Sequence, residues 1–191
     1  MYHIKNDQRA LRSCDLIYEG LAALLAQKPF EAIKVNELAD QAQVGRATFY
    51  RNFDLIEDVL RWRCDQVLDA LFASLASGVY VPQPGERMPF LQPVLRYFSN
   101  HSQLIELLIQ ARRTDLLELA FYQRLARLKP QMMALIDAPE VYLEYGLVIR
   151  SSVVVNVLIH WVRTGKQDAP DLLAAGLNEV ASQMRAHNLL L

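Results

Sequence analysis

The sequence contains few of the residues from which sheets, tight turns and disulfide frameworks are built. Its 191 residues include three threonines, seven glycines, eight prolines and two cysteines. Leucine and alanine, which are strong helix formers, together number 52. Because the turn residues are too few for a many-stranded sheet, these proportions predict an all-α fold.

The chain also lacks an excess of either charge and a long uninterrupted apolar run. Its net charge is −1 and its isoelectric point is near 6.4, so no general positive field draws it to nucleic acid or to a membrane. Any polyanion must therefore bind locally. The N-terminal residues contain no apolar core of a secretion signal, and the longest apolar stretch, residues 153–162, is interrupted by Asn156 and His160. We expect a soluble, cytoplasmic protein without membrane association.

Sequence patterns of enzymes and metal sites are absent. Neither HExxH nor GxxxxGK occurs, no glycine-rich loop follows a strand pattern, and no histidine has an acidic residue three positions before it. The four histidines are scattered, and Cys14 and Cys64 lack CxxC spacing. We predict no catalytic residue, no metal and no cofactor, and we interpret both cysteines as packing residues in a reducing cytoplasm.

Apolar residues recur at spacings of three and four through most of the chain and predict about nine helices. Asp54 is expected to cap the fourth helix, Pro130 to kink or split the seventh, and Pro139 to begin the eighth. Residues 78–86, with two glycines and two prolines, form the clearest loop. The expected helices cover residues 7–27, 35–42, 46–52, 54–77, 88–100, 103–111, 115–136, 139–163 and 168–187.

Residues 35–53 carry the pattern of a helix-turn-helix, in which residues 43–45 join two short helices. The residues that supply its shared core are Leu38, Ala42, Val44, Phe49 and Phe53. Ala39 is small enough to let the second helix approach closely. We therefore expect residues 1–53 to form a small three-helix unit that contains this motif and residues 54–191 to form a larger helical unit.

The second helix of this motif offers side chains suited to reading DNA. Arginine pairs bidentately with guanine, threonine or alanine can meet the thymine methyl group, and tyrosine or asparagine can bind phosphate oxygens. Gly45 leaves the helix with unblocked N-terminal amides, which favour a phosphate. The side chains expected to be exposed are Arg46, Ala47, Thr48, Tyr50, Arg51 and Asn52.

Residues 8–62 closely resemble the N-terminal domain of TetR-family transcriptional regulators. The likeness rests on the run VNELADQAQVGRATFYRNF, whose triplet Thr48-Phe49-Tyr50 is followed by Phe53, on Phe30 and Ile33 before the run, and on Glu57 and Leu60 near its end. The resemblance implies a ligand-responsive homodimeric repressor, whose second motif helix enters the major groove of a palindromic operator in double-stranded DNA. It assigns residues 1–53 to a helix-turn-helix DNA-binding domain and residues 54–191 to a helical effector-binding and dimerisation domain. The expected DNA-binding residues are Val35, Gly45, Arg46, Ala47, Thr48, Tyr50, Arg51 and Asn52.

Three positions depart from the usual pattern of that family. Gln43 stands where a turn glycine is usual, and Gly45 replaces a serine or threonine cap. Ile56, close to the acidic Asp54, replaces a phosphate-binding lysine, so phosphate affinity should suffer. Residues 1–53 carry seven Lys or Arg against six Asp or Glu, which makes the placement of each charge important. Two alternatives stay open: a dimer that has lost DNA binding and acts through a protein partner, and a transcriptional activator.

The C-terminal helices are expected to supply both a dimer interface and an effector cavity. Helix 139–163 has more apolar surface than one buried face needs, so we expect it to pair with a second subunit; burial inside a monomer is the alternative. Asn156 is the most informative polar residue, because an amide in an apolar helix must find a partner. Helix 54–77 is expected to couple a small-molecule effector to DNA binding. The candidate ligand-binding residues are Trp62, Tyr97, His101, Arg112, Tyr122, Asn156 and His160.

Overall fold

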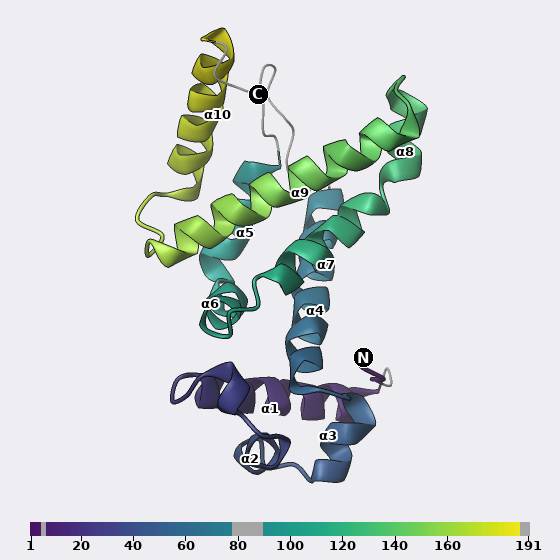
Figure 1. The fold of residues 1–191 in the computed structure, drawn as a ribbon, viewed down its shortest axis with the longest axis vertical. Helices are drawn as coiled ribbons and strands as arrows, with labels where there is room; N and C mark the ends of the chain where they lie inside the picture. The colour runs from purple at the N-terminus through teal and green to yellow at the C-terminus, as the bar shows by residue number, and fades with distance from the viewer. Residues whose placement is uncertain (5–6, 78–89, 188–191) are drawn as a thin grey trace. The chain divides into compact units, whose positions relative to one another are not determined.

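The structure, a computed structural model, describes residues 1–4, 7–77 and 90–187 (Figure 1). Within these residues the chain forms ten α-helices, one 3₁₀ turn and no strand, which confirms the all-α prediction. The loop expected at residues 78–86 lies outside the described residues. In chain order the elements are α1 (Gln8–Leu25), the 3₁₀ turn (Phe30–Ala32), α2 (Val35–Gln41), α3 (Arg46–Asn52), α4 (Ile56–Ala76), α5 (Leu91–Asn100), α6 (Gln103–Gln110), α7 (Asp115–Ala126), α8 (Lys129–Leu135), α9 (Glu140–Arg163) and α10 (Pro170–Ala186).

Proline sets two of the helix boundaries. The segment expected as one helix over residues 115–136 is two helices, α7 and α8, and Pro130 lies in the first turn of the second. A proline is tolerated there because the amides of a first helical turn have no partner within the helix. Pro139 was expected as the first residue of the long apolar helix; it is instead the N-cap of α9, with an extended ψ of 140°.

The start of α4 differs from the prediction that Asp54 caps it. The helix begins at Ile56, and the backbone amide of Leu55 donates to Oδ2 of Asp58 at 2.9 Å. Phe53 is fully buried with an extended backbone, which places Asp54 outside the helix. The Asp54 carboxylate lies 3.0 Å from Nε2 of His3, so it binds the N-terminal segment instead.

The described chain divides into two compact units. The N-terminal unit comprises residues 1–67 and 104–120, and the C-terminal unit comprises residues 68–103 and 121–191. α4 and α7 therefore each contribute residues to both units. The domain boundary expected at residue 53 stays a prediction.

The core of the N-terminal unit is formed by helices that would be unstable alone. α2 and α3 have seven residues each, so their stability comes from buried side chains. The ring centroids of Phe49 and Phe53 lie 5.8 Å apart, and those of Phe53 and Trp62 lie 6.1 Å apart. The fully buried residues of this core include Cys14, Ile17, Leu21, Leu38, Phe49, Phe53, Val59, Leu60 and Cys64. The predictions that the two cysteines and most of the motif core are buried are confirmed.

The backbones of α1 and of the residue that follows α2 approach each other closely at Gly20 and Ala42. A Cβ atom at Gly20 would lie 3.1 Å from the backbone nitrogen of Ala42, so only glycine fits without a shift. Ala39, which was expected to permit close approach, is buried with 1% exposure. The small residues Gly20 and Ala42 thus let α1 support the helix-turn-helix.

In the C-terminal unit, α5 and α10 are joined by a charged contact and α9 ends at a glycine. Arg96 donates to both carboxylate oxygens of Asp171, at 2.6 and 2.9 Å. This bond, together with Gln92, lowers the pKa of the Asp171 carboxyl. Gly165 has a φ of +79° and follows α9, as its place in the sequence predicts.

Of the described helices, α9 alone has the length and composition of a candidate membrane span. Its residues Leu147, Val154 and Leu158 are buried inside the C-terminal unit. A core helix of a soluble protein has the same properties, so this helix indicates no membrane.

Candidate nucleic-acid interface

The turn between α2 and α3 has the hydrogen bonds of a Schellman motif. The amide of Val44 donates to the carbonyl of Ala39 at 2.9 Å, and the amide of Gln43 donates to that of Asp40 at 3.1 Å. Gln43 has a φ of +54°, in the left-handed region that favours glycine. This confirms that Gln43 adopts the turn conformation without glycine's freedom.

Gly45, in contrast, does not require glycine geometry. It is the N-cap of α3 with φ −71° and ψ 146°, which any residue adopts, and a Cβ atom added there would meet nothing within 4 Å. Its carbonyl accepts from the amides of Thr48 and Phe49 at 2.8 and 3.2 Å. The helix start therefore has room for a capping side chain that the sequence does not supply.

The start of α2 is fixed by a charged cluster beside Val35. Glu37 accepts from the amide of Lys34 at 3.1 Å and from the ammonium group of Lys28 at 2.6 Å. The Lys28 bond, followed by the Lys34 amide, lowers the pKa of the Glu37 carboxyl. Val35, the first residue of α2, is half-buried. The backbone at the start of α2 is thus held in place by the bonds that Glu37 accepts from Lys28 and from the amide of Lys34.

α3 has one buried face and one exposed face. Phe49 is fully buried and contacts the ring of Tyr50 edge-on at 5.4 Å, while Tyr50 itself is 56% exposed. Thr48 is half-buried. Arg46, Ala47 and Arg51 are exposed. Five of the six side chains expected on the surface therefore have solvent access.

Asn52 is the exception, and the prediction that it is exposed is wrong. It is 4% exposed, and its Nδ2 donates to the carbonyl of Thr48 at 2.8 Å. Its own carbonyl accepts from the amide of His3 at 2.9 Å, and Tyr2 forms an isolated β-bridge with Phe53. The N-terminal segment therefore covers the end of α3, which periodicity within α3 could not reveal.

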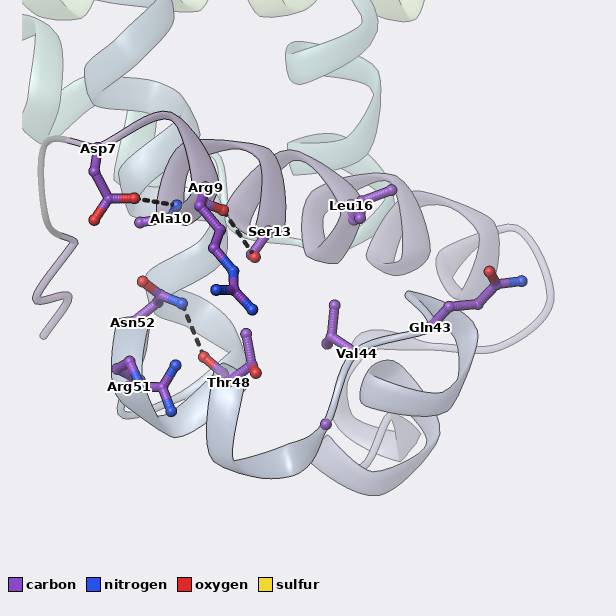
Figure 2. Close-up of a pocket in the computed structure, with 11 residues that line it drawn as sticks. Asp7, Arg9, Ala10, Ser13, Leu16, Gln43, Val44, Thr48, Arg51 and Asn52 are labelled. Carbon is purple, nitrogen blue, oxygen red and sulfur yellow. Dashed lines mark hydrogen bonds between the residues drawn. The ribbon is translucent and has the colours of Figure 1, made fainter.

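An open groove of about 650 Å³ runs between α1 and α3 (Figure 2). Arg9 and Ser13 of α1 face Thr48 and Arg51 of α3 across it. Arg9 was not among the predicted site residues. The signal was its spacing of four from Ser13 and seven from Leu16, which places these residues on one face of α1. The groove thus brings a second arginine beside Arg51.

A second open groove has a volume of about 560 Å³. It is lined by the predicted DNA-binding residues Val35 and Tyr50 and by Ile56, which stands in place of the usual lysine. Lys34 is its single lining cation within the described residues, against the acidic Glu31, Asp54 and Glu57. Glu57 is bound by Arg61 and Arg113, and a hydrogen bond from His3 is the largest cause that lowers the pKa of Asp54. With isoleucine in place of the usual lysine at position 56, Lys34 is therefore the one cation that lines this groove within the described residues.

None of the predicted ligand-binding residues lines the two grooves described above. Trp62 lies in the core of the N-terminal unit, and Arg112 is exposed in that unit, while its neighbour Arg113 points inward to Glu57. Tyr97 and His101 stack with ring centroids 4.4 Å apart. The remaining candidates lie in the C-terminal unit: Tyr122 is half-buried, and Asn156 and His160 are exposed.

Asn156 finds its partner within its own helix. Its Nδ2 donates to the carbonyl of Ser152 at 2.8 Å, one turn earlier in α9. The amide therefore has a hydrogen bond without a ligand, and its ligand role stays a prediction. Among the described residues, no group of three His, Cys, Asp or Glu side chains is arranged to hold a metal ion.

The C-terminal unit contains an apolar cavity of about 270 Å³ that sequence reasoning missed. It is lined by Phe90, Leu91, Gly146, Ile149, Arg150, Val153 and Val154. The available signal was Gly146 followed by Arg150, one turn later in an otherwise apolar helix. Those positions share a face of α9, but only the fold places Phe90 and Leu91 opposite them.

The same unit exposes several large apolar side chains on its two longest helices. On α9 these are Val141, Tyr142, Tyr145, Val148, Ile149 and Val153, and on α10 they are Leu172, Val180 and Met184. Scattered exposed apolar residues are common on soluble proteins, but a series along neighbouring turns is typical of an interaction surface.

Comparison with known proteins shows which family the helix-turn-helix resembles and which solved structures have a similar fold. Residues 17–61 match the sequence profile of "Bacterial regulatory proteins, tetR family". Lin0861 of Listeria innocua has a similar structure, with a TM-score of 0.78, 16% identity and coverage of 95% of this chain and 96% of that one. The fatty acid degradation regulator FadR of Bacillus halodurans has a TM-score of 0.54 at 14% identity, covering 92% and 95%. No protein of curated function matches the sequence.

Proposed function

Since the chain is a TetR-family transcriptional regulator rather than an enzyme, we propose that it is a homodimeric repressor that binds a palindromic operator and is released by a small-molecule effector. The main support is α3, which buries Phe49 while Arg46, Ala47 and Arg51 stay exposed. Such a helix can lie in the major groove without disturbing the core of the N-terminal unit.

Each exposed residue of α3 is assigned a contact according to its chemistry. Arg46 and Arg51 read guanine, and Ala47 with the partly exposed Thr48 meets thymine methyl groups. Arg46 Nη1 donates to Asn36 Oδ1 at 3.3 Å, a long and exposed bond that DNA can replace. Tyr50, Val35 and the backbone at Gly45 contact phosphates.

Two further residues of the N-terminal unit complete the proposed interface. Arg9, across the groove from Arg51, adds a phosphate contact from α1. Asn52 is too buried to bind DNA directly, so we assign it to holding the end of α3 through Thr48. Its role is to position the exposed arginines.

Dimerisation is supported by the exposed apolar side chains of α9 and α10 other than Ile149 and Val153, which line the apolar cavity. Covering them with a second subunit removes apolar area from water, which stabilises association by about 25 cal/mol for each Å². A dimer also presents two reading helices, as specific recognition of a palindrome requires. Light scattering should give twice the 21.8 kDa of one chain, and a monomer at micromolar concentration would contradict this proposal.

Coupling between effector and operator is proposed to pass through α4. This helix contributes residues 56–67 to the N-terminal unit and residues 68–76 to the C-terminal unit. A small shift of such a helix would spoil simultaneous docking of two reading heads spaced about 34–36 Å apart, or a multiple of that spacing. Coupling is reciprocal, so operator must weaken effector binding by the same factor that effector weakens operator binding. Titration of effector with and without operator tests this, and equal affinities would show that the units are uncoupled.

One observation favours the alternative of a regulator that has lost DNA binding and acts through a protein partner. The groove containing Ile56 is lined by three acidic residues and a single lysine. Such a surface repels phosphate and suits a basic partner. Failure of the full-length protein to enrich any sequence from random DNA would support this function over operator binding.

A further inference from the structure

The apolar cavity of the C-terminal unit contains one charged group. Arg150 extends from α9, and its Cζ atom lies 4.3 Å from the centroid of the Phe90 ring. The other side chains that line the cavity are hydrocarbon, and include Leu91, Val153 and Val154. A single cation is thus held against an aromatic ring at the wall of an apolar space.

Arg150 differs from the other inward arginines in its partners. Arg124, in the same unit, is 4% exposed and donates to Asp69 at 3.0 Å, and Arg113 is bound to Glu57. Arg150 is half-buried, and within residues 1–4, 7–77 and 90–187 no carboxylate pairs with it. Burial lowers its pKa, but a guanidinium stays charged at neutral pH. A partly desolvated cation with only a ring beside it gains from an anionic partner.

Gly146, itself exposed, lies at the open wall of the cavity one helical turn before Arg150. A Cβ atom added at Gly146 would meet nothing within 4 Å, so packing does not require glycine there. Glycine inside a helix destabilises it relative to alanine. The wall of the cavity beside Arg150 therefore contains a residue that the helix itself does not favour and that packing does not require.

We propose that this cavity binds a small amphipathic carboxylate, with its carboxylate on the Arg150 guanidinium and its apolar portion over Gly146 toward Leu91 and Val153. One guanidinium matches one carboxylate in charge and in its two parallel hydrogen bonds. A phosphate monoester carries nearly two charges and would leave one uncompensated in apolar surroundings. The volume of about 270 Å³ suits a small ligand. This inference rests on the proposed function only in identifying the ligand as the effector.

The test measures ligand binding to the purified full-length protein by calorimetry, without DNA. The probes are hexanoate, octanoate and dodecanoate, each compared with the alcohol of the same chain length. At least one carboxylate should bind about tenfold or more tightly than its alcohol, and Arg150→Met should remove that preference. Arg163→Met, at the exposed end of the same helix, is the matched control and should leave binding unchanged.

A second variant tests the cavity without changing its charge. Gly146→Leu should fill the space and abolish carboxylate binding, whereas Gly176→Leu, at an open position of α10, should not. Thermal unfolding of both variants verifies that they fold.

Equal binding of carboxylates and alcohols, absence of binding by every probe, or unchanged binding by Arg150→Met would overturn the proposal. If a carboxylate binds at Arg150 but does not release DNA, this inference holds and the effector-coupling proposal fails. If DNA is bound and no carboxylate is, this inference fails and the proposal of operator binding stands.

Discussion

The amide of Val44 donates to the carbonyl of Ala39 across Gln43, whose left-handed backbone turns the chain from α2 toward α3. This turn fixes the angle at which α3 leaves α2. A glutamine performs it although a left-handed backbone costs a non-glycine residue about 1 kcal/mol.

Replacing Gln43 with glycine should therefore stabilise the protein. We expect Gln43→Gly to raise the free energy of unfolding by about 1 kcal/mol, measured by urea denaturation. Gln41→Gly, at the last residue of α2, is the control and should lower it by roughly 0.5–1 kcal/mol, because its backbone is helical. A loss of stability in Gln43→Gly would show that the glutamine side chain stabilises the turn in another way.

Restoring a cation at Ile56 should strengthen DNA binding. With an operator identified, Ile56→Lys should raise affinity and steepen the dependence of log affinity on log salt by about 0.9, the contribution of one phosphate contact. Met133→Lys supplies the same charge at an exposed position of the C-terminal unit. Equal salt slopes for the two variants would mean that Ile56 does not face a phosphate.

Substitutions in α3 should separate base contacts from phosphate contacts. Arg46→Ala and Arg51→Ala should each cost about 1–3 kcal/mol of operator binding and relax the sequence preference at one position. Tyr50→Phe and Arg9→Ala should weaken binding to all sequences alike. Fluorescence anisotropy with operator and single-base variants distinguishes these patterns. Unchanged affinity and preference in both α3 arginine variants would place a different surface on the DNA.

The two cysteines should be unreactive in the folded protein. Both are fully buried, and burial, followed by the charge of Asp15, raises the pKa of Cys14 to about 12. The reactive thiolate is therefore scarce at pH 8. A disulfide reagent should modify neither cysteine in buffer and both in strong denaturant. Fast modification of the native protein would show that the core of the N-terminal unit opens readily.

The sequence predicts the helix-turn-helix well because its signals are local. α3 begins and ends at the predicted residues 46 and 52, since Phe49 and Phe53 set its buried face and Gly45 precedes its first turn. The left-handed backbone of Gln43 was predicted from the family resemblance, in which a turn glycine is usual at this position. The burial of Asn52 could not be predicted, because it depends on His3 and Tyr2, about fifty positions away in the sequence.

The predicted ligand residues stay predictions, because periodicity identifies a face of a helix but not the segment that packs against it. Trp62, whose indole nitrogen is its one polar side-chain atom, is among the predicted ligand-binding residues. In the structure its ring packs against Phe53. Arg150 was passed over, although the apolar cavity around it requires Phe90 from a segment sixty residues earlier. Pairing between distant segments decides which polar residues face a cavity.

Selection of bound sequences from a random double-stranded DNA pool, with the full-length protein, tests the central claim most directly. We predict enrichment of a palindrome whose half-site centres lie about 34–36 Å apart, or a multiple of that, and loss of enrichment when Arg46 and Arg51 are both replaced by alanine. A pool that stays random after repeated selection, with protein that is dimeric in solution, would contradict an operator-binding repressor.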